Sequence, residues 1–221
     1  MGEQARRRDL KLDQIVKELR SAPRVQTLLA SALNSPNLRL DAKHYQEEFV
    51  AALARVKTSA YPNRPIGEVA DAFIPGRIKL ITVPTEGAGA PYLRAHDAFE
   101  TRPESDRYVA SMRVSNYDSL LLRKGMILTP SSGRNLGPVA YVGKYLSSFA
   151  MTDIMRIVPK SKIDGFYLLA YLLTETGQAL VRKGRTGTTV DHLAPADVLS
   201  IPLIWLGARP DRVWRRVFIA A

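Results

Sequence analysis

Six short runs of β-favouring residues, set close together in the middle of the chain, constrain its fold most. Glycine, proline, serine and asparagine separate them, as in strands joined by turns. The runs are Ile78–Val83, Tyr92–Phe99, Tyr108–Val114, Met126–Thr129, Val139–Val142 and Ile154–Val158. The elements expected after them are helices at Gly165–Leu173 and Thr176–Lys183, a short helix or turn at Pro195–Leu199, and a strand-like segment at Ile201–Leu206. Because the strands precede most of these helices, the sequence predicts an α+β domain.

The first part of the chain has helical periodicity instead. Apolar residues recur at helical spacing from Leu12 to Leu19, and a second short helix is predicted at Val25–Leu33. A third helix begins near Asp41, a suitable N-cap, and its apolar face comprises Tyr45, Phe49, Ala52, Leu53 and Val56. We therefore divide the chain into an N-terminal helical extension, 1–36, and a domain, 37–221. The apolar stripes of the first helices suit either a protein partner or packing on the chain's own domain.

The chain is strongly basic. It holds 32 Lys and Arg against 21 Asp and Glu, a net charge of +11, and 22 of the cations are Arg. Such a surplus favours polyanionic partners, and the planar guanidinium suits phosphate and guanine. The absence of cysteine excludes disulfides and thiolate zinc sites. The sequence shows no secretory signal and no apolar run long enough to span a bilayer, so we expect a cytoplasmic protein without a membrane partner.

Signals for catalysis are missing. The chain has no Asn-Pro-Pro-aromatic segment of the amino-methyltransferase type and no phosphate-binding loop of the Gly-x4-Gly-Lys-Ser/Thr type. The three histidines, His44, His96 and His192, are not spaced as metal ligands, and His96–Asp97 is expected to be a surface pair. We therefore expect no catalytic residue, no metal site and no cofactor in this chain.

One loop between two predicted strands carries side chains suited to base recognition. Arg pairs with guanine and Asn with adenine in the major groove, and each bidentate pair contributes about 1–3 kcal/mol of discrimination. The residues concerned are Ser131, Ser132, Arg134 and Asn135. The same segment also fits a β-hairpin turn with a solvated arginine, so both interpretations stay open.

Two further segments favour contact with phosphates. The loop after the second C-terminal helix combines cations and hydroxyls, namely Lys183, Arg185, Thr186, Thr188 and Thr189. It also fits a helix C-cap with Gly184 at C′, and the two interpretations are compatible. A glycine-rich loop at Gly87–Pro91 lies between further candidate contacts, namely Arg77, Lys79, Tyr92 and Arg94, although a plain surface loop is the simpler interpretation of it.

The order of several short motifs adds a resemblance to these observations. The motifs are Lys124-Gly-Met-Ile-Leu, Ser132-Gly-Arg-Asn-Leu-Gly-Pro-Val, Met155-Arg-Ile-Val-Pro, Tyr167-Leu, Gly177-Gln-Ala-Leu, Thr186-Gly-Thr-Thr, Asp197-Val and Ile201-Pro. In this order they resemble the target recognition domain of type I restriction-modification specificity subunits, over about residues 38–205. Met126 departs from the family, which often has an acidic residue there. A complete specificity subunit carries two such domains, and this chain has room for one.

The resemblance implies a mixed, mainly antiparallel curved sheet with C-terminal helices, and a non-catalytic subunit that recognises a short sequence in double-stranded DNA. It implies a partner adenine methyltransferase that holds S-adenosylmethionine, with a restriction subunit as a further partner. A homodimer and a second recognition subunit are both open. On this basis Arg77, Lys79, Lys144, Lys183 and Arg185 would bind phosphates. The residues proposed for bases or sugar-phosphate are Arg94, Ser132, Arg134, Asn135 and the threonines of 186–189. The alternatives are a structural adaptor in a defence complex and a divergent metal-dependent nuclease.

Overall fold

The computed structural model describes residues 42–76, 79–187 and 190–205. These residues belong to one compact unit that begins at Asp41. The predicted helical extension, 1–36, lies outside the described residues, as do Arg77, Thr188 and Thr189.

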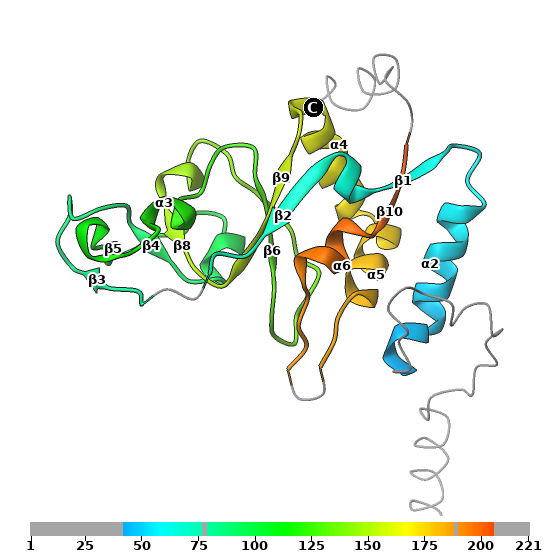
Figure 1. Cartoon of the computed structure of the whole chain (residues 1–221), viewed down its shortest axis with the longest axis horizontal. Helices are drawn as coiled ribbons and strands as arrows, with labels where there is room; N and C mark the ends of the chain where they lie inside the picture. The colour runs from blue at the N-terminus through cyan, green and yellow to red at the C-terminus, as the bar shows by residue number, and fades with distance from the viewer. Residues whose placement is uncertain (1–41, 77–78, 188–189, 206–221) are drawn as a thin grey trace, which may run out of the picture. The chain divides into compact units, whose positions relative to one another are not determined.

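A four-stranded antiparallel sheet lies at the centre (Figure 1). Its strands, in spatial order, are β2 (Ala70–Phe73), β9 (Ile154–Pro159), β6 (Ile127–Pro130) and β7 (Ala140–Tyr141). The sequence predicted β6, β7 and β9 within one or two residues. It missed β2, whose Ala-Asp-Ala-Phe segment is poor in β-branched residues and forms a strand by pairing with β9.

Three short strand pairs complete the sheet structure. They are β1 (Asn63–Pro65) with β10 (Pro202–Ile204), β3 (Thr82–Val83) with β5 (Tyr108–Val109), and β4 (Tyr92–Leu93) with β8 (Ala150–Met151). Only the last of these described pairs is parallel. The mixed, mainly antiparallel α+β fold is therefore confirmed. The runs Tyr92–Phe99 and Tyr108–Val114 were predicted too long, because each ends in a 3-10 turn, η4 (Asp97–Phe99) or η5 (Ser111–Arg113).

The helices agree closely with the sequence patterns. α4 (Lys162–Leu173), α5 (Glu175–Lys183) and α6 (Pro195–Leu199) lie where they were expected. The third predicted helix is α2 (Glu47–Lys57), which buries Phe49, Ala52 and Val56 as predicted but begins later than Asp41. A 3-10 turn, η2 (Ala42–Tyr45), precedes it. The remaining short elements are η3 (Ile66–Glu68), α3 (Tyr117–Leu120) and η6 (Leu146–Ser148).

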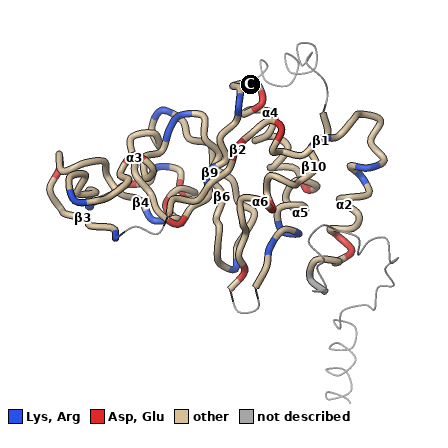
Figure 2. The backbone as a smooth tube through the Cα atoms, in the orientation of Figure 1, with Lys and Arg blue, Asp and Glu red and all other residues tan. Residues whose placement is uncertain are grey.

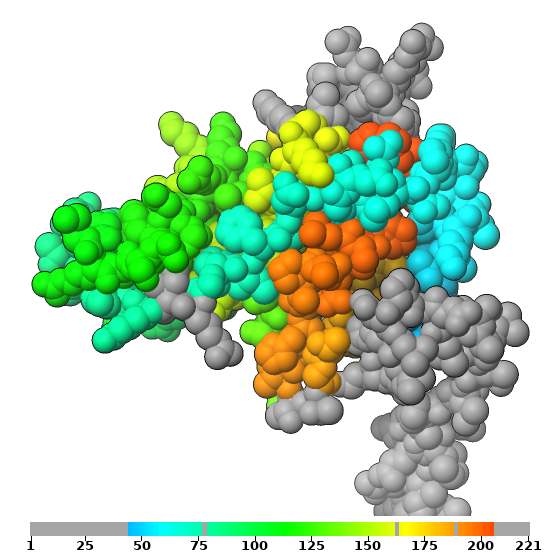
Figure 3. Space-filling model, in the orientation of Figure 1, coloured from blue at the N-terminus to red at the C-terminus, as the bar shows by residue number. Residues whose placement is uncertain are grey.

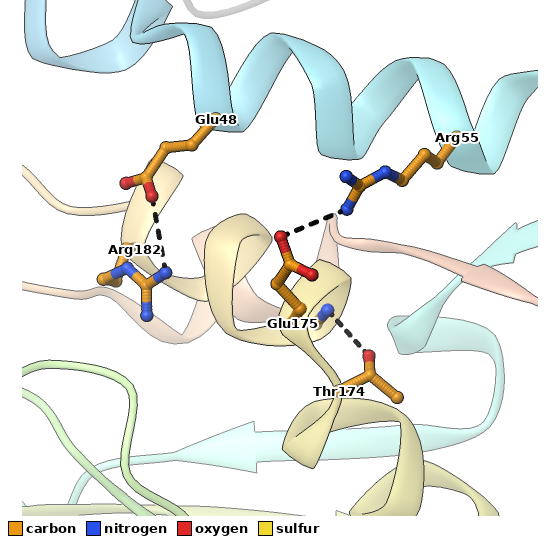
Figure 4. Close-up of polar contacts among 6 residues, drawn as sticks. Glu48, Arg55, Thr174, Glu175 and Arg182 are labelled. Carbon is orange, nitrogen blue, oxygen red and sulfur yellow. Dashed lines mark hydrogen bonds and ion pairs between the residues drawn. The ribbon is translucent and has the colours of Figure 1, made fainter.

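Apolar clusters cover both faces of the central sheet. Ile127 packs with α2, α4 and α5, whereas its neighbour Leu128 packs in a second cluster with Leu93 and Met151. Successive residues of a strand point to opposite faces, so this division follows from the strand geometry. Two ion pairs border the α2–α5 contact, Arg55–Glu175 at 3.4 Å and Arg182–Glu48 at 3.7 Å (Figure 4). Both are exposed, so apolar burial stabilises this contact far more than the ion pairs do.

The corner between α4 and α5 is unusually tight. Thr174 ends α4 and caps α5, where its hydroxyl accepts a hydrogen bond from the Gly177 amide at 3.0 Å (Figure 4). A Cβ atom on Gly177 would lie 2.1 Å from the carbonyl oxygen of Tyr171, so only glycine fits here. The next residue, Gln178, donates from its amide to the Leu172 carbonyl at 2.6 Å and to the Gly137 carbonyl at 2.7 Å. This corner therefore also fixes the end of the loop between β6 and β7.

Candidate nucleic-acid interface

Two loops that the sequence analysis treated separately meet in the structure. His192 lies between them and pairs with Ser132 on one side and with Thr186 on the other, both antiparallel. The His192 amide donates to the Thr186 carbonyl at 2.6 Å, and the Thr186 amide donates to the His192 carbonyl at 2.8 Å. The β6–β7 loop and the loop after α5 thus form a small three-stranded junction.

The junction has one exposed and one buried face. Ser132, Thr186 and His192 are exposed. Their chain neighbours Ser131 and Leu193 are buried, and Leu193 belongs to the main core cluster. The Gly133 amide donates to the Asp191 carbonyl and the Leu193 amide to the Ser131 carbonyl, both at 2.9 Å, which fixes the register. The atoms of the segment around His192 (orange) lie at the surface beside those of the β6–β7 region (green) (Figure 3).

Of the residues of the β6–β7 loop that were predicted to recognise bases, Ser132 is exposed in the junction, whereas Ser131 lies in the junction but is buried. Arg134 and Asn135 are exposed in the β6–β7 loop, two and three residues beyond Ser132. The buried Ser131 donates to the Asp153 carbonyl at 3.3 Å and so has a structural contact. Gly133 has a φ of 117°, a conformation that glycine adopts without strain, and it turns the loop outward.

The cations of the second loop already have partners within the protein. Arg185 pairs with Asp191 at 3.6 Å and lies 5.9 Å from the ring of Phe49. The Lys183 ammonium contacts the His44 ring. Gly184 is the C-cap residue of α5, and a Cβ there would approach Leu193 and Asp197 at 3.0 Å. α5 therefore ends at this segment as expected, but Gly184 is the C-cap residue with a right-handed backbone (φ −67°) and not the C′ residue that was predicted. Phosphate contact by these cations stays a prediction.

Tyr92 is connected to the junction through the turn between β8 and β9. Its hydroxyl bonds to the Thr152 hydroxyl at 2.9 Å, and Thr152 bonds to the Asp153 carboxylate at 3.2 Å. Asp153, in turn, accepts the hydrogen bond of Ser131. Arg94 is exposed close to Tyr92, and its amide bonds to Asp97. Lys79 is exposed as well.

Lys144 lies at the opposite end of β6 from these loops. Met126 directly precedes β6, and its carbonyl accepts a hydrogen bond from the Val142 amide. Lys144, two residues after Val142, therefore lies near the start of β6. A cavity of about 550 Å³ near this end is lined by Arg123, Lys124 and Lys160, among others. Lys and Arg thus occur at both ends of the central sheet and do not gather at the junction alone (Figure 2).

One arginine of the motif series is buried. Arg156 is fully inaccessible, and its guanidinium donates to the carbonyls of Leu120, Met151 and Ile154 at 2.9, 2.8 and 3.4 Å. Desolvation by burial lowers the pKa of Arg156 to about 10, below the usual value for arginine. This side chain therefore joins α3, β8 and β9 from within and cannot contact DNA.

The tyrosines of α4 are also structural. Tyr171 donates to the Pro202 carbonyl at 2.7 Å, and Tyr167 donates to the Ile204 carbonyl, so both hold β10 against the helix. Burial raises the pKa of both phenols above its usual value.

One group of potential metal ligands occurs among the described residues. His96, Asp97 and Glu100 place their ligand atoms within 4.8 Å of one another. His96 is exposed and pairs with Asp97 at 2.7 Å, as expected for a surface pair. No described helix is long and apolar enough to cross a membrane.

Comparisons with known proteins find likeness in structure only. No protein-family model and no curated protein matches the chain. A structure solved in work on assembly and conformational transition of the type I R-M system matches 99% of this chain and 50% of its own, with 17% identity and a TM-score of 0.50. The resemblance to this family is confirmed at the level of the fold.

Two further structures have lower scores. The HsdS subunit from Thermoanaerobacter tengcongensis has a TM-score of 0.48 and 19% identity over 99% of this chain and 49% of its own. The type I restriction-modification S subunit from M. genitalium has a TM-score of 0.44 and 13% identity over 66% of this chain and 34% of its own. The chain spans about half the length, or less, of the solved structures that it matches.

The sequence analysis missed His192 and Gln178 as positioned residues. His192 was considered only as a metal ligand, and its place between two loops depends on pairing across 60 residues of chain. A signal for Gln178 was present, because Gly177-Gln178 belongs to the motif series, but the motif alone does not reveal the carbonyls that it binds.

Proposed function

We propose that this chain is a DNA-recognition domain of a type I restriction-modification specificity subunit, without catalytic activity of its own. The observation that carries the proposal is the junction around His192, where two loops rich in hydroxyl, amide and cationic side chains meet on a fold of this family. The net charge of +11 supports double-stranded DNA as the partner.

Within this function the exposed side chains have different tasks. Arg134 and Asn135 extend from the loop beside the junction and are suited to guanine and adenine edges. Lys79, Arg94 and Lys144 are exposed cations that would bind phosphates and set affinity without specifying sequence.

The partners follow from the same proposal. An adenine methyltransferase subunit carrying S-adenosylmethionine would be directed to the DNA site, and a restriction subunit could join the complex. Since the chain spans half of the structures it matches, a second recognition domain would come from another copy, from a second subunit or from a longer protein.

The test is selection from a randomised duplex library by the full chain, with and without a candidate methyltransferase subunit, at two salt concentrations. We expect a short enriched motif and a steep loss of affinity with salt. Arg134→Ala should relax the preference at one position, whereas Lys144→Gln, its matched exposed control, should leave the motif unchanged.

Two outcomes would contradict this function, and a third would reject the role of one residue. Enrichment of no motif, with salt-independent binding of a protein partner, favours the structural adaptor. DNA cutting by the isolated chain that depends on a divalent metal favours the nuclease. An Arg134→Ala variant with the wild-type preference rejects the role of that residue.

A further inference from the structure

The junction arranges three exposed side chains in a single row. Directly paired residues of antiparallel strands place their side chains on the same face of the sheet. His192 is paired with Ser132 and with Thr186, so all three side chains lie on one face, in the order Ser132, His192, Thr186. The exposure of all three, above the buried Ser131 and Leu193, agrees with this arrangement.

The row is held rigidly from below. Its central strand is bonded on both sides, through Thr186 on one side and through Ser131 and Gly133 on the other. Beneath it Leu193 is buried in the main core cluster, and Arg185 pairs with Asp191. Gly187, with a φ of 116°, closes the turn behind Thr186, where a Cβ would lie 2.2 Å from the Val190 carbonyl oxygen. Because the backbone beneath these side chains is already fixed by hydrogen bonds, little further backbone entropy is lost when a ligand binds to them.

The chemistry of the row suits base edges better than phosphates. A neutral imidazole offers one donor and one acceptor, and each hydroxyl offers both. Ser132 and Thr186 carry no charge, and the mixed donors and acceptors of the row match the mixed pattern that base edges present in the major groove. Adjacent strands lie about 4.8 Å apart, so the row is about 10 Å long, and it fits the major groove, which is about 12 Å wide.

On these grounds we propose that Ser132, His192 and Thr186 form a base-recognition row in which His192 determines the preference at the central position. The inference rests on the proposed function and specifies which side chains of that site distinguish one DNA sequence from another. The Ser132 end lies next to Arg134 and Asn135 in the same loop, so the row extends the surface that the loop already offers to the groove.

The test repeats the library selection with His192→Ala in the full chain. We expect the preference to fall by about 2- to 10-fold, the contribution of one or two hydrogen bonds, at one or two adjacent positions. Affinity for unselected duplex should stay within about twofold, because the row is proposed to contact bases and the phosphate contacts of the other cations are retained. Ser132→Ala and Thr186→Val should relax positions on opposite sides of the one that His192 determines, because the row is straight.

The matched control is His96→Ala, another exposed histidine, which should keep the wild-type motif. The unfolding temperature of His192→Ala should equal that of wild type, since within the described structure only backbone atoms of His192 form hydrogen bonds. A His192→Ala variant that keeps the full motif, or that weakens all duplexes equally, overturns the row. A wild-type chain that enriches no motif refutes the proposed function itself, which distinguishes the two failures.

Discussion

Replacement of Gly177 by alanine sets two physical effects against each other. Gly177 lies in the first turn of α5, and in an exposed helix alanine would be more stable than glycine by about 1 kcal/mol. Here the added Cβ would lie 2.1 Å from the Tyr171 carbonyl oxygen and 2.9 Å from the Leu172 Cα, both backbone atoms that cannot turn away. The α4–α5 corner must open by about 1 Å, and overpacking of this kind costs about 1–3 kcal/mol or more.

Opening the corner also disturbs Gln178, whose two hydrogen bonds reach across it. Adding about 1 kcal/mol for a weakened bond and subtracting the gain of about 1 kcal/mol in helix propensity, we expect Gly177→Ala to reduce the free energy of unfolding by about 1–3 kcal/mol. For a chain of this size the unfolding temperature should fall by about 2–12 °C, as measured by circular dichroism.

The control for this experiment is Gly143→Ala. A Cβ on Gly143 meets nothing within 4 Å, and its φ is not positive, so stability should stay within about 0.5 kcal/mol of wild type. A Gly177→Ala variant as stable as wild type, or more stable, would show that helix propensity outweighs the contact and would refute the argument.

Three further predictions concern stability and DNA affinity. Arg156→Lys should reduce the free energy of unfolding by about 1–3 kcal/mol in urea titrations, because one ammonium cannot reproduce the planar fork that binds three carbonyls; Arg134→Lys, at an exposed site, should have no effect. Burial raises the pKa of Tyr167 and Tyr171 in the folded chain, so on raising the pH these phenols ionise in the unfolded chain before they ionise in the folded one. The stability that they contribute is therefore complete below about pH 10 and is lost as the pH rises further. Replacing both by phenylalanine should flatten that alkaline decline, and an unchanged decline would contradict the assignment. Lys144→Gln should weaken binding to every duplex and reduce the salt slope by about 1, and a changed motif would disprove a phosphate role.

The helices and most strands could be predicted because their signals are local. The apolar spacing of Phe49, Ala52 and Val56 identifies the buried face of α2 without knowledge of its partner. β1 and β2 were missed because pairing with distant strands, and not their own composition, makes them strands. The resemblance to the family predicted the correct fold class although β1 and β2 were missed, but it did not predict the register in which the strands pair.

The candidate site was predicted only in pieces. The two loops around Ser132 and Thr186 were each recognised from their composition, yet no local pattern shows that His192 joins them. Lys183 and Arg185 remain predicted to bind phosphates, but the composition of their loop does not reveal their contacts with His44 and with Asp191. The pairing of His192 with Ser132 and the contact of Lys183 with His44 join residues far apart in sequence.

The motif series consists largely of scaffold residues, and this explains why it indicates a family but no DNA target. Arg156 binds three backbone carbonyls, Gly177 permits the α4–α5 corner, and Gln178 holds the loop at Gly137. Any chain with this scaffold needs such groups, whatever DNA it recognises. Of the three exposed residues of the row, Ser132 and Thr186 belong to the motif series and His192 does not. Surface substitutions usually change stability by less than about 0.5 kcal/mol, so all three positions tolerate exchange. Exchanging Ser132, His192 and Thr186 together should therefore change the preferred DNA sequence and leave the fold intact.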